Sequence, residues 1–258
     1  MTAPATPSLV AFIPARAGSK RIPDKNINVL QGHPLLAYSI CAARESGIFD
    51  AVILCTDSVK YAEIGRHYGA EVPFLRPADI SDSTSPDIEW VEMFLHRLAD
   101  AGRHFTAFSI LRPTSPFRKA STIRRAWNDF SAAGQAVDSL RAIEKCAQHP
   151  GKMWVVRGNR MLPLLPMGPE EQPYHSTQYA ALPTVYVQNA SLEIAWSRVA
   201  LEGRTIAGNT LLPFITEGDE GIDINNPEDW WYAEHMLREG AARLPTIDRA
   251  PYGRPDET

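Results

Sequence analysis

The chain has 258 residues and a formal net charge of −4 at pH 7, with 44% hydrophobic and 22% charged residues. Because this composition lies close to the globular average, it excludes intrinsic disorder as the main state, and the length suggests one large or two small domains. With 26 Lys and Arg against 30 Asp and Glu, and no apolar run near the roughly 20 residues of a membrane helix, neither a nucleic-acid nor a membrane partner is expected.

The first 70 residues alternate between short apolar runs, typical of strands buried on both faces, and longer helical patterns. In chain order these are strand 9–13, polar loop 16–32, helix 34–46, strand 51–55 and helix 59–68. Either Asp57 or Ser58 can cap the second helix. The alternation predicts an α/β fold with a doubly wound, Rossmann-like, mostly parallel sheet.

The same alternation continues, apart from an irregular, Pro-rich stretch at 144–183. The further predicted elements are strand 71–75, helix 86–99, strand 106–111, helix 120–130, strand 136–142, strands 184–187 and 192–196, and helix 227–237, capped by Asn226. We therefore expect an α/β core made of 8–143 and 184–244, an inserted arm of short strands over 144–183, and a flexible tail over 245–258.

The amino terminus and the cysteines bear on the cellular compartment. Residues 1–8 have neither the basic nor the hydrophobic stretch of a signal peptide. The three cysteines, Cys41, Cys55 and Cys146, are odd in number and far apart, which does not suggest a disulfide or zinc framework. These features predict a cytoplasmic protein.

The loop after the first strand concentrates positive charge. Four cations, a glycine and a serine lie within ten residues: Arg16, Gly18, Ser19, Lys20, Arg21 and Lys25. Free N–H groups with Lys and Arg at the carboxyl edge of a parallel sheet suit a phosphate ligand. The glycine spacing fits neither G-x-x-x-x-G-K-[ST] nor G-x-G-x-x-G. A solvated basic loop is the alternative interpretation.

Five motifs in chain order resemble those of the sugar-activating cytidylyltransferases, the family of CMP-sialic acid and CMP-KDO synthetases. They are the segment 13–26, Thr56-Asp57, Leu75-Arg76-Pro77 with Ser81-Asp82-Ser83, Pro113–Arg118, and Ile222-Asp223-Ile224. The Pro-Thr-Ser-Pro stretch resembles the branch that acts on nine-carbon sugar acids (sialic, legionaminic or pseudaminic acid). The resemblance implies that the sugar's anomeric hydroxyl attacks the α-phosphate of CTP, with Mg²⁺ as cofactor, and that pyrophosphate leaves.

The resemblance also implies roles for individual residues. The catalytic group is Arg16, Lys20, Lys25 and Asp223. The nucleotide-binding group is Ala15, Arg16, Gly18, Ser19, Asn26, Arg76, Ser81, Ser83 and Ser85. The sugar-binding group is Arg112, Thr114, Ser115, Lys152, His175, Gln188 and Asn189, and the metal group is Asp223 and Asn225. Without the resemblance, the sequence indicates simpler structural roles. The segment 81–85 is then a turn before a helix, Asp223 and Asn225 cap a helix, and Lys152 is a solvated lysine.

Three departures from the family pattern bear on the substrate. Arg112 stands where the sialic acid enzymes have Gln, and its planar fork can meet the sugar carboxylate or a phosphate. Asn225 replaces the second Asp of Asp-Ile-Asp, while Val187 and Ala190 replace Arg and Gly. A GTP-dependent enzyme, an enzyme for another 2-keto sugar acid such as KDO, and a non-catalytic nucleotide sensor therefore remain alternatives.

The inserted arm carries more apolar residues than so small a segment can bury alone. They are Met153, Trp154, Val155, Met161, Leu162, Leu164, Leu165 and Met167. In the family that the chain resembles, this insertion reaches over a partner subunit. We therefore expect a homodimer with twofold symmetry.

Overall fold

The computed structural model describes residues 7–82 and 84–253, which form two compact units. The first unit is built from residues up to Ala142 and from Asn189 onward, and the second is Ile143–Gln188. None of the helices in the described ranges has the length and apolar character needed to cross a membrane.

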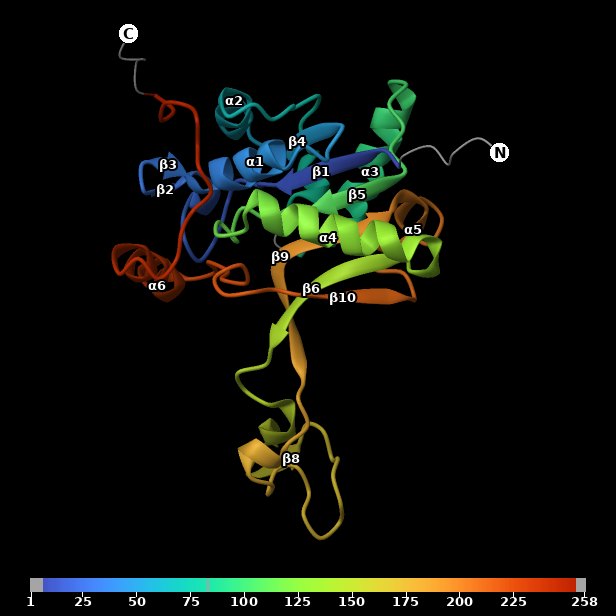
Figure 1. The fold of residues 1–258 in the computed structure, drawn as a ribbon, viewed down its shortest axis with the longest axis vertical. Coiled ribbons are helices and arrows are strands. Elements are labelled where there is room, and N and C mark those ends of the chain that lie inside the picture. The colour runs from blue at the N-terminus through green and yellow to red at the C-terminus, as the bar shows by residue number, and fades with distance from the viewer. Residues whose placement is uncertain (1–6, 83, 254–258) are drawn as a thin grey trace. The chain divides into compact units, whose positions relative to one another are not determined.

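A six-stranded sheet with the order β10-β6-β9-β5-β1-β4 forms the centre of the first unit (Figure 1). Its strands are β1 (Leu9–Pro14), β4 (Ala51–Cys55), β5 (Ala107–Ile110), β6 (Ser139–Lys145), β9 (Tyr186–Trp196) and β10 (Leu211–Ile215). Strand β1 is parallel to both β4 and β5, whereas β9 is antiparallel to β5. The predicted α/β fold with a mostly parallel sheet is confirmed, and the sheet is mixed at β9.

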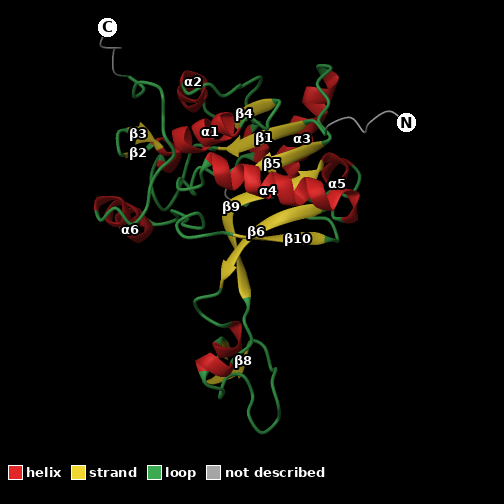
Figure 2. Cartoon of the chain, in the orientation of Figure 1, coloured by secondary structure: helices red, strands yellow, loops and turns green. Residues whose placement is uncertain are grey.

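Helices lie on both sides of this sheet (Figure 2). They are α1 (Leu35–Ser46), α2 (Val59–His67), α3 (Asp87–Asp100), α4 (Ala120–Ala133) and α5 (Ser197–Leu201), whereas α6 (Pro227–Arg238) packs in a separate cluster with Leu30, Leu35 and Phe117. Because successive strand residues point to opposite faces, β1 sends Leu9, Ala11 and Ile13 into a core with α1, α2 and α4. Its Val10 and Phe12 enter a second core with α3. Burial on both faces explains why β1 is an unbroken apolar run.

Two helix starts follow the predicted capping chemistry. Ser58 Oγ accepts a hydrogen bond from Tyr61 N at the start of α2, and Asn226 Oδ1 accepts one from Asp229 N at the start of α6. In turn, the Asp229 carboxylate accepts a hydrogen bond from the Asn226 N–H, which completes a capping box. Of the two candidate caps for α2, the serine is used, and Asp57 is left to bond elsewhere.

Shorter elements connect the sheet and the helices. They are the antiparallel pair β2 (Val29–Leu30) and β3 (His33–Pro34) and the 3₁₀ turns η1 (Lys25–Ile27), η2 (Ala78–Ile80) and η3 (Gly134–Ala136). The predicted strand 71–75 is wrong: only Glu71 bridges to Ile53 of β4, because Pro73 cannot donate the hydrogen bond that would extend the ladder. The two strands predicted between 184 and 196 form one strand, β9.

The segment 245–253, the first part of the predicted tail, contacts other residues of the first unit. His67 Nε2 lies 2.8 Å from Ala250 O, and Tyr252 N donates to Tyr68 Oη at 3.1 Å. The Tyr252 ring also meets the His67 ring edge-on at 5.5 Å. The polar, Pro-bearing composition predicts fraying, and the structure shows aromatic and main-chain contacts in this part. The rest of the predicted tail, 254–258, lies outside the described residues.

The second unit consists of an antiparallel hairpin and two 3₁₀ turns. The hairpin is β7 (Trp154–Arg157) and β8 (Arg160–Pro163), and the turns are η4 (Pro150–Lys152) and η5 (Tyr179–Ala181). Lys152 Nζ donates to the main-chain oxygens of His175, at 3.0 Å, and Thr177, at 2.5 Å. This lysine therefore ties two parts of the unit together and is not simply solvated.

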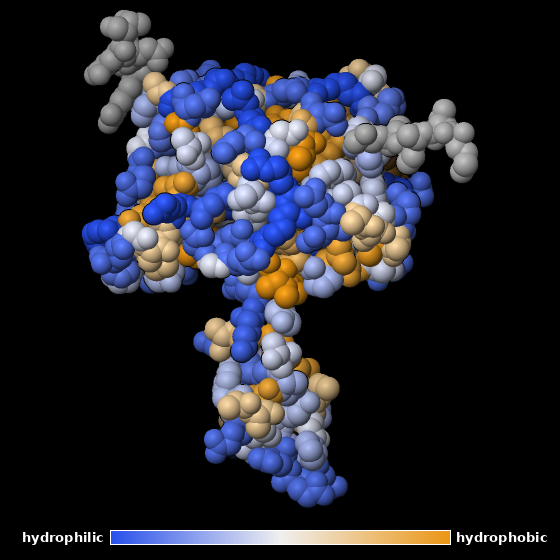
Figure 3. All heavy atoms as spheres, viewed as in Figure 1, coloured by the Kyte–Doolittle hydropathy of each residue, from blue (hydrophilic) through white to orange (hydrophobic). Residues whose placement is uncertain are grey.

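Apolar side chains of the second unit remain at its surface. Figure 3 shows hydrophobic residues among the polar surface atoms of this unit. The exposed ones are Met153, Trp154, Val155, Val156, Met161, Leu162, Leu164, Leu165, Met167, Tyr179, Tyr186 and Val187. Val156 and Met161 face each other across the hairpin and are 71% and 53% exposed. Exposed apolar patches of this kind mark interaction surfaces.

Candidate active site

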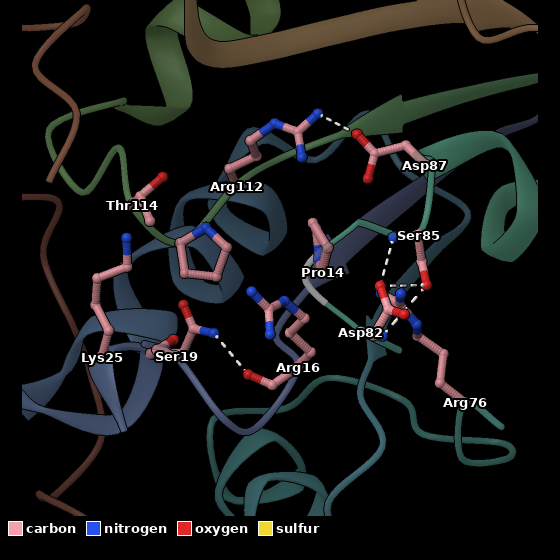
Figure 4. A pocket seen from close by; sticks show the side chains of 12 residues that line it. Pro14, Arg16, Ser19, Lys25, Arg76, Asp82, Ser85, Asp87, Arg112 and Thr114 are labelled. Atoms are coloured by element: carbon pink, nitrogen blue, oxygen red, sulfur yellow. Dashed lines mark hydrogen bonds and ion pairs between the residues drawn. The ribbon is translucent and has the colours of Figure 1, made fainter. Parts of the chain in front are cut away.

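A cavity of about 260 Å³ lies where strands β1 and β5 end (Figure 4). It is lined by Pro14, Arg16, Ser19, Lys25, Asn26, Arg76, Asp82, Ser85, Asp87, Arg112, Pro113 and Thr114. All of these residues belong to the first unit. The carboxyl edge of an open α/β sheet is where such folds bind ligands, so this cavity is the candidate active site.

One wall of the cavity is the loop after β1. Asn26 Nδ2 donates to the main-chain oxygen of Arg16 at 3.2 Å, and Ala17 N donates to Asp57 Oδ1 at 2.7 Å. Gly18 follows with φ +75°, a left-handed conformation that glycine adopts without strain. The loop is thus held by side chains from two other segments, so that Arg16 and Ser19 line the cavity.

The four cations of this loop are divided between the cavity and the solvent. Arg16 and Lys25 line the cavity, whereas Lys20 and Arg21 are exposed and lie outside its lining. Lys25 Nζ donates to Ile224 O at 2.8 Å. Burial lowers the pKa of Lys25, and the nearby Asp223 carboxylate opposes this effect. The predicted role of Lys20 therefore has no support from its position.

Arg76 is a buried cation on another wall. It is 6% exposed, donates to Ile80 O, and its guanidinium lies 5.5 Å from the centre of the Trp90 ring. Burial lowers the pKa of Arg76. Its Nε is buried and has no hydrogen-bond partner among the described residues.

The segment after Arg76 is a turn organised by Asp82. Its Oδ1 accepts bonds from Thr84 N at 2.6 Å and Ser85 N at 2.8 Å, which lowers the pKa of Asp82 to about 2. Asp82 and Ser85 line the cavity, whereas Ser81 bonds to Pro77 O, outside the lining. Ser83, also predicted to bind the nucleotide, lies outside the described residues.

Arg112 is held by carboxylates of the protein itself. Its Nη2 lies 2.6 Å from Asp87 Oδ2 and 2.9 Å from Glu193 Oε1, and Figure 4 shows the bond to Asp87. The other Glu193 oxygen pairs with the buried Arg141. Two arginines and two carboxylates balance one another here, so Arg112 meets a ligand with its charge already compensated.

Asp223 and Asn225 lie next to the cavity. Ile224, between them, donates its N–H to Thr114 O at 2.8 Å and accepts from Lys25, and both partners line the cavity. Asn225 Nδ2 donates to Asp223 Oδ2 at 2.5 Å. Asp223 Oδ1 is buried and has no hydrogen-bond partner among the described residues. Neither residue caps α6, because Asn226 does so.

Arg118 is a buried cation that the predicted site omitted. It is 1% exposed and donates to Ser191 O, to Ser39 Oγ at 2.7 Å and to Arg112 O at 3.4 Å. Burial lowers its pKa, and the Asp223 carboxylate opposes this effect. The arginine thus fixes the main chain of the 112–118 loop beside Asp223.

The remaining predicted residues are not part of the lining of this cavity. Ala15 and Ser115 are buried beside it, and Ala15 N donates to Cys55 O at 3.0 Å. Asn189 Nδ2 donates to Thr216 Oγ1 at 2.9 Å. Lys152, His175 and Gln188 belong to the second unit. The lining residues that the predicted site omitted are Pro14, Asp82, Asp87 and Pro113, and all stand within or just after the quoted motifs.

The family follows from a comparison with known sequences. The family model described as cytidylyltransferase matches residues 10–149, more than half of the chain. The chain therefore belongs to the cytidylyltransferase family.

Individual relatives narrow the resemblance. A CMP-N,N'-diacetyllegionaminic acid synthase of Legionella pneumophila is 34% identical over 232 residues, covering 89% of this chain and 96% of that protein. A pseudaminic acid cytidylyltransferase of Campylobacter jejuni is 36% identical over 121 residues, covering 47% of this chain and 52% of that protein. An N-acylneuraminate cytidylyltransferase of Escherichia coli is 40% identical over 118 residues, covering 46% of this chain and 27% of that protein.

Solved structures show the same fold. A CMP:2-keto-3-deoxy-manno-octonic acid synthetase complexed with CTP superposes with a TM-score of 0.63 at 11% identity, covering 90% of this chain and 99% of that one. A 4-diphosphocytidyl-2C-methyl-D-erythritol synthase from Anaerococcus prevotii gives a TM-score of 0.57 at 14% identity, covering 90% and 99%. At these identities the likeness concerns the fold.

Proposed function

We propose that the protein transfers CMP from CTP to a nonulosonic acid, giving a CMP-sugar acid and pyrophosphate. The observation that carries the proposal is the cavity at the ends of β1 and β5, with Arg16, Lys25 and Arg76 in its walls. Membership of the cytidylyltransferase family supports the nucleotidyl transfer. The Legionella relative, aligned over nearly its whole length, supports a sugar acid of the legionaminic type.

The chemistry needs positioning and charge compensation more than covalent help. In our proposal Arg16 and Lys25 bind the triphosphate, and Arg76 and the 82–85 turn bind the nucleoside. The anomeric hydroxyl then approaches the α-phosphate from the 112–114 side. Fixed cations in a partly buried site stabilise the charge that develops on phosphate oxygens and on departing pyrophosphate.

The residues beside the cavity fit a magnesium ion bound with the nucleotide. Mg²⁺ takes one or two carboxylates plus phosphate oxygens, and Asp223 Oδ1 is a buried carboxylate oxygen without a protein partner among the described residues. When bound, Mg²⁺ supplies charge neutralisation at the phosphates. Asn225 would orient the Asp223 carboxylate through its amide and not act as a second ligand. No cluster of three His, Cys, Asp or Glu suited to a metal occurs in the described part.

The sugar subsite would adjoin Arg112 and Thr114. Because Asp87 and Glu193 already compensate Arg112 through its Nη2, we propose that the guanidinium binds a neutral polar group of the sugar. This choice differs from the carboxylate or phosphate partners considered from the sequence. Use of GTP, and of KDO as the sugar, remain alternatives for this same site.

We further propose that the protein is a cytoplasmic homodimer and that its second unit forms the interface. The exposed apolar residues of that unit support the dimer. The three cysteines are free thiols, in keeping with a reducing compartment.

Pyrophosphate release tests the proposed reaction. CTP and GTP are each supplied with legionaminic, pseudaminic and sialic acid and KDO, with Mg²⁺ present. We expect release with CTP and a nonulosonic acid, and none without the sugar. Release only with GTP would favour the GTP-dependent enzyme, and release only with KDO would favour an enzyme for that sugar acid. Binding of CTP without turnover of any sugar would favour the nucleotide sensor.

A further inference from the structure

A single peptide group in the cavity wall is held from both ends by side chains. The peptide between Arg16 and Ala17 presents its oxygen to Asn26 Nδ2 at 3.2 Å and its N–H to Asp57 Oδ1 at 2.7 Å. Asn26 comes from the 3₁₀ turn η1, and Asp57 comes from the loop that follows β4. The two bonds fix the plane of this peptide group.

The held peptide governs which loop groups face the cavity. It joins Arg16, a lining cation, to Ala17. Gly18 follows, and its φ of +75° turns the chain toward Ser19, another lining residue. If the 16–17 peptide rotates, the Arg16 side chain and the N–H groups of the following turn change direction. Preorganised N–H groups and cations bind phosphate well because they need no reordering on binding.

The charge of Asp57 would oppose the binding of a triphosphate. A carboxylate in the loop after β4 lowers the positive potential of a site that contains Arg16 and Lys25, and it also interacts with Arg76. Helix α2 is capped by Ser58, so capping does not explain the aspartate. The contact that does explain it is the hydrogen bond in which Asp57 Oδ1 accepts the Ala17 N–H.

We infer that Asp57 is a positioning residue for the triphosphate of CTP, acting with Asn26 by fixing the 16–17 peptide. This inference rests on the proposed function. It predicts different results for two substitutions at one position: Asp57→Ala removes the acceptor, whereas Asp57→Asn keeps an acceptor oxygen and removes the charge.

The experiment measures kcat and KM for CTP, and the binding of CTP and inorganic tripolyphosphate by calorimetry. A hydrogen bond to a charged group changes a binding constant by about tenfold or more. We therefore expect Asp57→Ala to raise the KM for CTP, and the dissociation constants of CTP and tripolyphosphate, by about tenfold. Asp57→Asn should leave them unchanged or lower them. Asn26→Ala should resemble Asp57→Ala, and the double variant should lose less than the product of the two effects, because both act on one peptide.

Asp50 provides a matched control. Its Oδ2 accepts the N–H of Leu9 at 2.7 Å, at the other end of β1, so Asp50→Ala removes the same kind of bond far along the strand. It should lower the melting temperature but leave the affinity for CTP unchanged.

Three results would overturn the inference. They are a tenfold loss in Asp57→Asn, unchanged phosphate affinity in a folded Asp57→Ala, and a wild-type protein that binds neither CTP nor tripolyphosphate. If the wild type binds CTP but converts no sugar acid, the proposed function fails while the binding comparison still decides the role of Asp57.

Discussion

The side chain of Lys25 and the main chain of Ile224, 199 positions apart, are joined by a hydrogen bond of 2.8 Å. Ile224 also donates its N–H to Thr114 O at 2.8 Å. The basic loop, the Pro-Thr-Ser-Pro loop and the Asp223 segment are therefore connected directly, although each belongs to a different part of the chain. This connection brings the proposed phosphate, sugar and metal groups to one cavity.

Lys25 and Lys20 should contribute differently to nucleotide binding. Lys25 lines the cavity and Lys20 is exposed outside its lining. Since a charge-assisted contact to phosphate is worth about a factor of ten or more in affinity, Lys25→Ala should raise the KM for CTP by at least that factor. Lys20→Ala should change it by less than about threefold, as expected of an exposed charge. Equal effects in steady-state kinetics would refute this division.

Nucleotide affinity should depend on the protonation of Lys25. Burial lowers the pKa of this lysine below 10.5, and only the charged form attracts phosphate. Affinity should therefore fall as the pH rises through the lowered pKa. Calorimetric titration of CTP between pH 7 and 10.5 should show this loss in the wild type. Lys25→Arg stays charged throughout this range, so a wild-type profile as flat as that of the arginine variant would contradict the prediction.

Asp223 should matter for turnover more than for CTP binding. Asp223→Asn keeps the shape of the side chain and removes the charge that would hold Mg²⁺. We expect kcat to fall about a hundredfold, with the CTP dissociation constant within about threefold of wild type. Asp219→Asn is the control, since Asp219 pairs with Lys119 at 3.3 Å, outside the cavity lining. A variant at 223 with normal turnover at low Mg²⁺ would rule out this metal role.

Glu193 should contribute strongly to stability. It is 4% exposed and holds Arg112 at 2.9 Å as well as Arg141. Removing one partner of a buried ion pair leaves an uncompensated charge, so Glu193→Gln should lower the free energy of unfolding by about 3 kcal/mol. Glu71→Gln breaks an exposed pair with Arg103 at 2.6 Å and should cost less than about 1 kcal/mol. The free energies of unfolding are measured in urea. Comparable losses in the two variants would contradict the prediction.

The apolar pair of the second unit should maintain the proposed dimer. Val156 and Met161 face each other on the hairpin and are largely exposed. Replacing both by Asp should convert a dimer to a monomer in light scattering, because two charges would be buried in an apolar interface. Val59→Asp, at a 61% exposed position on α2, should leave the mass unchanged. A wild-type monomer at micromolar concentration would defeat the dimer.

Local patterns predicted the core of the fold well. The strands β1 and β4 are buried on both faces and therefore appear as unbroken apolar runs, and the caps Ser58 and Asn226 use local hydrogen bonds. The mixed direction of β9 and the packing of Tyr252 on His67 depend on contacts between distant segments. No local pattern contains that information.

The candidate site shows the same limit. Cations near Gly18 were recognisable as a phosphate loop, but which of them face the cavity depends on Asn26 and Asp57, which hold the loop main chain. Likewise, the sequence suggests that Arg112 meets the sugar carboxylate or a phosphate, whereas in the structure Asp87 and Glu193 compensate its charge. These partners lie 25 and 81 positions away, so only the fold reveals them.

The most direct test of the account is the release of pyrophosphate from CTP by the wild-type protein with Mg²⁺, in the presence and absence of a nonulosonic acid. The account predicts release that requires the sugar acid and yields an equal amount of CMP-sugar. No release with any sugar acid of this class, under conditions where the folded protein binds CTP, would contradict it.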